Sequence, residues 1–390
     1  MFKDRAILLL ALGETLIWAA FLYLFPASLV RWEADLGWSK ADLTLAITIA
    51  LFASAFAAPF AGRAIDRGHG PTQMGLAAVI GGVALIGVSQ ITTLWQFYIL
   101  WLVIGVCMAG TLYEPCFAMV TRARGATAKQ GIILITLAAG FAGTVSFPTV
   151  HFLSEAFGWR AATAIIGGVV IIFVAPVLWS GAKGLGNLAA PPSTRKPPAS
   201  SSYLHNPVYW LLGTGFALSA LTHGATLHHI LPLLEERGLA PQLAVFAASC
   251  IGPMQVVGRL GMVATQRRFS HHIFALIAFT FIGSSVAVLL AAGASLVLIG
   301  AFVVLFGSAY GTVSILRPVI ARDLLGEENF GAKSGGLALL YLAASASSAY
   351  LGALLWGIGG YTLMLWILIA FAAMGAVLYT AAHHLAKSRV

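Results

Sequence analysis

Apolar stretches long enough to cross a lipid bilayer recur along almost the whole chain. The sequence contains twelve of them, near residues 6–30, 42–61, 71–91, 95–121, 130–153, 161–182, 207–233, 242–265, 273–292, 296–321, 334–356 and 361–382. A helix of about 20 apolar residues spans a hydrocarbon core of about 30 Å. Only 9% of the residues are charged, compared with about 25% in a typical soluble domain. The sequence therefore predicts an all-α integral membrane protein with twelve transmembrane helices.

Basic residues are distributed unequally between the two sides of these predicted helices. Sixteen of the 22 Lys and Arg residues fall at one side, whereas Arg31, Lys40, Arg160 and Arg237 fall at the other. Because Lys and Arg in short loops stay cytoplasmic, we expect a multi-pass protein of the cytoplasmic (inner) cell membrane with both termini in the cytoplasm. The net charge of +9 then reflects topology and attraction to anionic lipid. We expect no nucleic acid as a partner.

One segment between the sixth and seventh stretches has a different composition. Residues 183–206, KGLGNLAAPPSTRKPPASSSYLHN, are rich in Pro, Ser and small residues. Such a segment cannot bury enough apolar surface to fold. We expect a cytoplasmic linker there, between an N-terminal six-helix bundle at 1–182 and a C-terminal six-helix bundle at 207–390.

The two halves share local patterns at an offset of about 201 residues. The sequences GWSKADLT and GLAPQLAV each begin an even-numbered stretch, and the pairs Asp66-Arg67 and Arg267-Arg268 each follow the end of one. A duplicated six-helix unit would leave such a pattern. Two parallel repeats around a central cavity are typical of secondary transporters.

The loop after the second stretch carries a more specific pattern, an acidic-basic pair four and five residues after Gly62. It resembles a motif of the major facilitator superfamily, in which such a pair latches neighbouring helix ends, so the resemblance implies a gating role for Asp66 and Arg67. Thr72 and Gln73 replace basic residues of the family pattern.

The sequences GWSKADLTLA, GPMQVVGRL and the GWR at 158–160 are similar to the branch of monocarboxylate and oxalate:formate porters. In topology the resemblance covers the full length, and it implies the major facilitator fold with two six-helix pseudo-repeat bundles.

An arginine in the eighth stretch is the best candidate for a substrate anchor. The porters that this chain resembles place an arginine there to hold a carboxylate, and Arg259 occupies that position. Guanidinium offers several donors to a carboxylate and stays charged when buried, and Gln255, one turn earlier, could add a hydrogen bond. Alternatively, Arg259 only bonds helix-end carbonyls. The eleventh stretch lacks the lysine that oxalate porters use, which favours a solute with one acidic group.

Two charged residues lie beside prolines at near-corresponding places in the halves, Glu114 and Arg317. The resemblance implies that helices one, four, seven and ten line a central cavity, and these helices carry Glu14, Glu114, His223 and Arg317. Ionisable residues inside a membrane are costly and mark solute or ion pathways. Glu114 and Arg317 could form a switch that loads and unloads a proton, or bind solute. Alternatively, they form a permanent structural pair, or Arg317 snorkels to the interface.

Further predictions concern this cavity and the adjacent histidine pairs at 228–229, 271–272 and 383–384. Glu14 could be a second proton site or a hydrated carboxyl with no role in the mechanism. Tyr113, which adjoins Glu114, and His223 could bind solute or could be structural. The adjacent histidine pairs point in different directions on a helix, so we expect no metal site.

Together these features predict a secondary active transporter, not an enzyme, that moves a small organic solute. We expect a carboxylate-bearing anion and coupling to protons by alternating access. The alternative is a proton-driven exporter of a drug or metabolite. No HExxH, GxSxG or phosphate-binding loop is present in the sequence, and we expect no cofactor. The expected partners are the solute, protons and the lipid bilayer, and we expect a monomer.

Overall fold

The computed structural model describes residues 4–186, 204–266, 268–326 and 330–388. Within these ranges the chain forms helices and no strand, which confirms the predicted all-α class. It divides into two compact units, Met1–Ser193 and Thr194–Val390. The boundary falls within the predicted linker, of which 187–203 lie outside the described residues.

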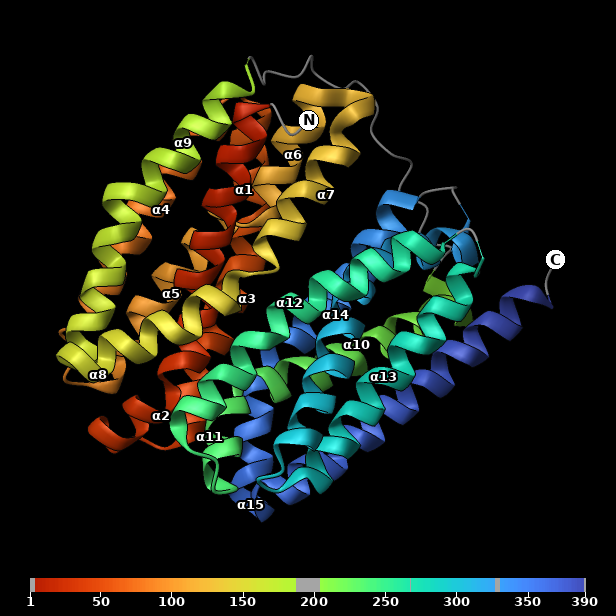
Figure 1. The fold of residues 1–390 in the computed structure, drawn as a ribbon. Coiled ribbons are helices and arrows are strands. Elements are labelled where there is room, and N and C mark those ends of the chain that lie inside the picture. Colours follow the sequence, from red (N-terminus) through yellow and green to blue (C-terminus); the bar gives the residue numbers. More distant parts are fainter. Residues whose placement is uncertain (1–3, 187–203, 267, 327–329, 389–390) are drawn as a thin grey trace. The chain divides into compact units, whose positions relative to one another are not determined.

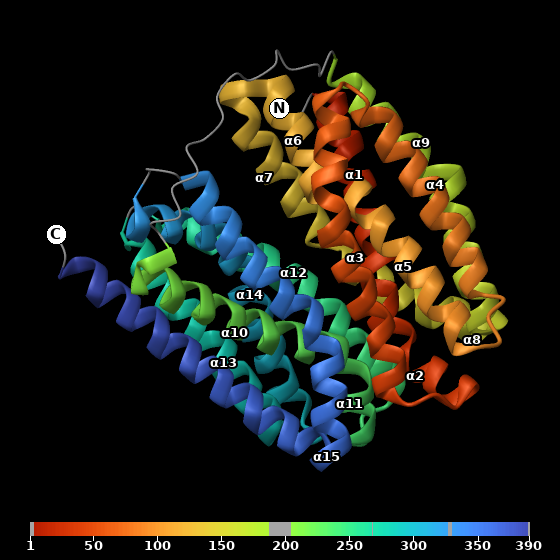
Figure 2. The same ribbon diagram turned by 180° about the vertical axis from the view of Figure 1, so that it is seen from behind.

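Helices of the N-terminal unit follow one another with short breaks (Figure 1). They are α1 (Arg5–Trp18), η1 (Ala19–Tyr23), α2 (Leu24–Leu36), α3 (Lys40–Asp66), α4 (Gly70–Val88), α5 (Leu94–Thr111), α6 (Tyr113–Arg124), η2 (Gly125–Thr127), α7 (Ala128–Ala139), α8 (Ala142–Val169), η3 (Val170–Val174) and α9 (Ala175–Gly184). The π-helical segment η1 lies just before Pro26, which cannot donate to the Leu22 carbonyl and so interrupts the helical ladder. α4 runs beside α9, and α3 packs on α5 (Figure 2).

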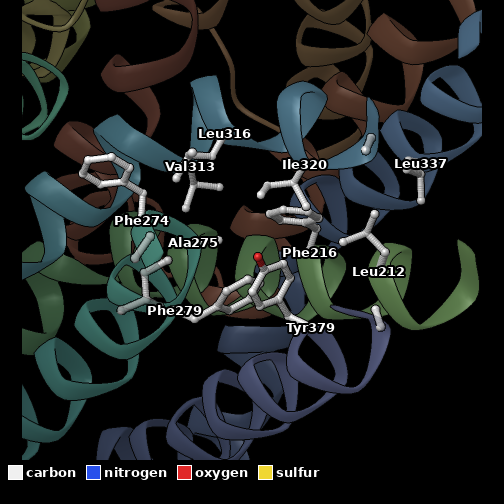
Figure 3. Packing of buried hydrophobic residues seen from close by; sticks show 14 of the residues in the cluster. Leu212, Phe216, Phe274, Ala275, Phe279, Val313, Leu316, Ile320, Leu337 and Tyr379 are labelled. Atoms are coloured by element: carbon white, nitrogen blue, oxygen red, sulfur yellow. The ribbon is translucent and has the colours of Figure 1, made fainter. Parts of the chain in front are cut away.

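Helices of the C-terminal unit surround an apolar core. They are α10 (Pro207–His228), α11 (Ile230–Glu236), α12 (Pro241–Thr265), α13 (His271–Ala292), α14 (Leu296–Leu325) and α15 (Phe330–Lys387). In the core, the Phe279 ring lies 5.6 Å from the Phe216 ring and 5.3 Å from the Tyr379 ring, measured between centroids (Figure 3). Leu212 and Ile320 pack in the same cluster. This core joins α10, α13, α14 and α15.

Nine stretches of the described chain are long and apolar enough to cross a membrane. Two of them, Ala128–Gly184 and Lys333–Lys387, are 57 and 55 residues long, enough for two crossings each. Both contain non-helical glycines, at Gly158 and at Gly359 and Gly360. Dividing each of the two at these glycines raises the nine stretches to eleven. The 22-residue helix α10, at the seventh predicted stretch, is the twelfth in the described residues.

The same kind of close helix contact occurs within each of the two units. A Cβ atom built on Gly105 of α5 would lie 2.1 Å from the Ala50 carbonyl oxygen of α3. A Cβ on Gly307 of α14 would lie 2.7 Å from the Ile251 carbonyl oxygen of α12. Gly307 and Ile251 follow Gly105 and Ala50 by 202 and 201 residues, close to the offset in the sequence. Small residues therefore bring the corresponding helix pairs together in both units.

Arginines bind the carboxyl-terminal ends of two corresponding helices. Arg160 donates to the carbonyl oxygens of Ser89 and Ile91, at the end of α4, at 3.0 and 2.9 Å. Arg237 donates to two carbonyl oxygens near the end of α13, including that of Leu290 at 3.2 Å. Positive charge is favourable at this end of a helix. The two arginines lie only 77 residues apart, so they do not correspond in the repeat.

An ion pair between Asp4 and Arg124 connects helix ends in the N-terminal unit. The Asp4 carboxylate accepts hydrogen bonds from the backbone of Ala6 and Ile7, which caps α1, and from Arg124 Nε at 2.8 Å. Arg124 also donates to the Leu185 carbonyl at 3.3 Å. The hydrogen bond from Arg124 holds the pKa of Asp4 below its usual value. This arrangement connects the start of α1 with the ends of α6 and α9.

The close helix contacts predict a steric effect of an added methyl group. Gly105→Ala and Gly307→Ala should each destabilise the protein by about 1–3 kcal/mol, because the new Cβ has no room. The measurement is the melting temperature of the purified protein in detergent. Gly168→Ala is the matched control, since no atom lies within 4 Å of a Cβ there. An unchanged melting temperature for Gly105→Ala would contradict the close approach of α3 and α5.

The lowered pKa of Asp4 predicts a pH-dependent stability. Asp4→Asn keeps a capping oxygen but loses the charge, so at pH 7 it should cost about 0.5–1 kcal/mol. The carboxylate's contribution is full above its unfolded pKa, near 3.8, and disappears as the pH falls through the lower folded value. Melting temperatures of both proteins should thus differ equally at pH 7 and pH 5, and the difference should shrink only as the pH falls below the unfolded value near 3.8. A difference that already shrinks between pH 7 and pH 5 would contradict this assignment.

Candidate functional site

A proline positions Glu114 at a break in the fourth membrane span. Pro115 has no N–H and cannot donate to the Thr111 carbonyl, so the span separates into α5 and α6 at Leu112, which is extended. Glu114 lies in the first turn of α6, where the partial positive charge of the helix terminus favours a carboxylate. The side chain of Glu114 is exposed. Interrupted spans of this kind occur at the binding sites of transporters.

Glu14 lies on α1 next to this break. Its side chain is 0% exposed, and its Oε2 accepts a hydrogen bond from Trp18 Nε1 at 3.2 Å. Oε1 has no hydrogen-bond partner of normal geometry among the described residues. On α6, the Cys116 thiol interacts with the Glu14 carboxyl group as a hydrogen-bond donor, and the Glu114 carboxylate lies nearby. Two predicted sites, Glu14 and Glu114, are thus close together.

Aromatic rings cover the same place. The Trp18 ring lies 4.7 Å from the Tyr113 ring, and Tyr113 stacks on Phe117 at 4.8 Å. All three side chains are partly exposed. We call Glu14, Trp18, Tyr113, Glu114 and Phe117 the acidic-aromatic cluster.

His223 is enclosed by rings in the C-terminal unit. Its imidazole stacks on the Tyr310 ring at 3.5 Å, with an interplanar angle of 2°, and on the Phe306 ring at 4.6 Å. It is 5% exposed, and neither ring nitrogen has a hydrogen-bond partner among the described residues. A buried imidazole without partners is costly, which makes a role beyond packing reasonable for this residue.

Both predicted arginines of this unit lie around Tyr310. The Arg317 guanidinium lies 4.1 Å from the centre of the Tyr341 ring, and the Tyr341 and Tyr310 side chains are neighbours. Arg259 and Arg317 both interact electrostatically with Tyr310. We call Arg259, Arg317, Tyr310, Tyr341 and His223 the arginine-tyrosine cluster.

Arg259 is held against a neighbouring helix. It is 5% exposed, and its Nε donates to the Gly311 carbonyl of α14 at 3.2 Å. Gln255, one turn earlier, is also buried, and a Cβ on Gly311 would lie 2.1 Å from its backbone oxygen. The carbonyl contact is of the kind expected for a structural arginine. An anchoring role of Arg259 stays a prediction.

Asp66 forms an ion pair at the end of α3. Its partner is Arg122 of α6, whereas Arg67 follows the end of the helix and is exposed. The two predicted latch residues, Asp66 and Arg67, do not pair with each other; the observed ion pair of Asp66 is with Arg122. A gating role of Asp66 and Arg67 stays a prediction, as does any pairing of Glu114 with Arg317, which belong to different units.

The paired histidines have different surroundings. His229 contacts the Ala349 carbonyl oxygen through Nε2 at 2.9 Å, a structural contact. His272 stacks on His383 at 3.5 Å, and His271 lies 2.8 Å from Asp323. In the described part of the chain, no group of three or more His, Cys, Asp or Glu side chains is arranged to hold a metal ion.

The sequence did not distinguish Tyr310 and Tyr341 from the other aromatic residues that could line a pocket or pack, and Arg122 was not among the predicted site residues. Tyr310 precedes Arg317 by seven residues, two helical turns on the same face, and this spacing could have found it. Tyr341 and Arg122 come from other helices. No local pattern in the sequence identifies them.

Two bundles of apolar helices with a few buried ionisable side chains define a multi-pass membrane protein of the transporter type. Residues 6–335 match the sequence profile described as Major Facilitator Superfamily. The chain therefore belongs to the major facilitator superfamily, and the predicted family and fold are confirmed. Proteins of this family are transporters, so the prediction that the chain is not an enzyme also holds.

Two curated relatives match at low identity. The chain is 24% identical over 302 residues to Monocarboxylate transporter 12 of Xenopus laevis, covering 70% of this chain and 65% of the relative. It is 26% identical over 305 residues to MFS transporter asaE of Aspergillus flavus, covering 73% of this chain and 66% of the relative. The chain thus spans slightly less than two thirds of the length of each of these relatives.

Solved structures share the fold. An inward-facing, occupied bacterial homologue of the human lysosomal transporter Spinster matches with a TM-score of 0.72, 15% identity and coverage of 97% of this chain and 96% of the other. The nucleoside transporter NupG matches with a TM-score of 0.70, 15% identity and coverage of 98% and 99%. At this identity, the likeness concerns the fold alone.

The ion pair of Asp66 and Arg122 generates a charge-reversal prediction. Asp66→Arg and Arg122→Asp should each lower the melting temperature by at most a few degrees, because a partly exposed pair contributes little. The double variant should recover most of the loss, since it restores opposite charges. Lys129→Gln, an exposed residue at the start of α7, is the control. A double variant that melts at the sum of both losses would show that the pair is not formed.

Proposed function

We propose that the chain is a secondary active transporter that moves a small carboxylate-bearing organic anion across the cytoplasmic membrane by alternating access, coupled to protons. The arginine-tyrosine cluster carries the proposal. Arg259 and Arg317 lie within apolar helices and share Tyr310 as a neighbour. Several donors in one place, held where water is scarce, suit a carboxylate.

Three residues complete this site in the proposal. Arg259 anchors the carboxylate, Arg317 adds a second positive charge, and His223 offers ring nitrogens that lack partners among the described residues. Gln255 supports Arg259 from the same helix. The weak similarity to a monocarboxylate transporter supports the choice of an acidic solute.

The proton-coupling part of the proposal concerns the N-terminal unit. Glu14 is fully buried and Glu114 lies beside it. Two neighbouring carboxyl groups repel each other when both are charged, which is a general setting for the exchange of a proton. In the proposal, Glu14 and Glu114 exchange that proton with solvent, and Asp66 and Arg67 gate the movement of the helices.

Transport in reconstituted vesicles tests the proposal. Radiolabelled monocarboxylates should enter proteoliposomes under an inward proton gradient, and a protonophore should remove the accumulation. Arg259→Ala should lower the uptake by about tenfold or more, because it removes charge-assisted hydrogen bonds worth about 1.5–3 kcal/mol. Arg268→Ala is the matched control, since Arg268 is exposed at the end of the same span.

The outcomes separate the parts of the proposal. Absence of monocarboxylate transport in either orientation would overturn it. Transport that persists after the gradient has collapsed would overturn only the coupling. Proton-driven efflux of cationic drugs that is insensitive to Arg259→Ala would favour the drug or metabolite exporter.

A further inference from the structure

Two of the three adjacent histidine pairs lie at one end of the C-terminal unit, and the proposed transport site uses neither of them. His272 of α13 stacks on His383 of α15, with ring centroids 3.5 Å apart and an interplanar angle of 7°. His272 Nδ1 also lies 2.9 Å from the Tyr379 hydroxyl oxygen. The stack thus joins the start of α13 to the end of α15, and the two helices run side by side (Figure 1).

Positive charge gathers around this stack. His384 and Lys387, both in the last turn of α15, are electrostatic neighbours of the two stacked imidazoles. An acid also lies in this region, Asp323 of α14, but its carboxylate contacts His271 at 2.8 Å. The last turn of α15 therefore favours a negatively charged ligand.

An apolar groove leads to these basic residues. It has a volume of about 410 Å³ and is lined by Ala376, Val377, Thr380, Ala381 and His384 of α15. Thr380 Oγ1 donates to the Ala376 carbonyl oxygen at 2.7 Å, so this hydroxyl group is already bonded within the helix. From Ala376 to His384 the helix rises by about 12 Å. The groove is therefore long enough to hold part of an acyl chain.

The basic end of the groove lies at the level expected for lipid head groups. The predicted apolar stretch ends near residue 382, and the exposed His384 and Lys387 follow within about one and a half turns. Basic side chains just beyond a span attract anionic lipid. They also complement the helix dipole, but that role needs no groove. An apolar groove that ends at exposed basic groups matches an acyl chain attached to an anionic head group.

We propose that this groove of α15 binds one anionic phospholipid. One acyl chain lies along the apolar lining, and the phosphate group accepts charge-assisted hydrogen bonds from Lys387 and His384. A zwitterionic head group is disfavoured, because it brings a second positive charge to the same place. The inference goes beyond the proposed transport and does not depend on it, since lipid binding needs no solute.

Native mass spectrometry of the purified full-length protein tests the inference. The protein in detergent is titrated with phosphatidylglycerol and, separately, with phosphatidylcholine that has the same acyl chains. The dissociation constant of the first bound lipid is measured at pH 7. Phosphatidylglycerol should bind about fivefold more tightly, as expected for one basic residue beside an anionic head group.

Variants locate the effect on α15. Lys387→Gln should remove most of the preference for phosphatidylglycerol. Ala381→Phe, which fills the groove without a change of charge, should weaken the binding of this lipid about fivefold or more. The matched controls are Lys183→Gln, at the end of α9, and Ala264→Phe, on α12, which should leave both affinities unchanged. All four side chains are exposed, and the comparison of the two lipids on the unmodified protein does not depend on the variants.

Each of four results would overturn the inference. Equal affinity for the two lipids would show that the head group is not recognised by charge. A preference that persists in Lys387→Gln would place the anionic lipid elsewhere on the protein. Unchanged binding of phosphatidylglycerol in Ala381→Phe would exclude the groove as the place of the acyl chain. Displacement of the lipid by an equal concentration of inorganic phosphate would identify a free anion as the ligand.

Discussion

Backbone-to-backbone contact between neighbouring helices is the constraint on which both units depend. Gly105 brings α5 onto the backbone of α3, and Gly307 and Gly311 bring α14 onto α12. Side chains between these helices would force them apart, because a Cβ has no room. The consequence reaches the candidate site, since the close packing of α12 on α14 allows Arg259 to donate to the Gly311 carbonyl. The position of the buried charge of Arg259 therefore depends on how closely these two helices pack.

The course of the chain through the membrane was predictable because it depends on local composition. Runs of about 20 apolar residues give the spans, and an offset of 201 to 202 residues recurs in the glycine contacts. Breaks inside a span were not predicted. The separation of α5 and α6 at Leu112 follows from Pro115, but other prolines, such as Pro253 in α12, lie inside a continuous helix. Whether a proline divides a helix depends on what its neighbours supply.

The candidate site was predictable in its charged residues and not in their surroundings. An ionisable residue within an apolar run is visible in the sequence and rare, so Glu14, Glu114, Arg259 and Arg317 could be identified one by one. Their partners come from other helices and depend on how those helices rotate against each other. Tyr341 below Arg317 is an example, because Tyr residues are common in membrane helices and only the contact distinguishes this one.

The arginines at the ends of α4 and α13 have a consequence for how closely the two units need to match in sequence. Both helix ends are bound by a guanidinium, although Arg160 and Arg237 are unrelated positions of the repeat. The requirement therefore belongs to the helix end and not to an inherited residue. Two units with corresponding helices can thus satisfy the same helix end with arginines from different positions of their sequences.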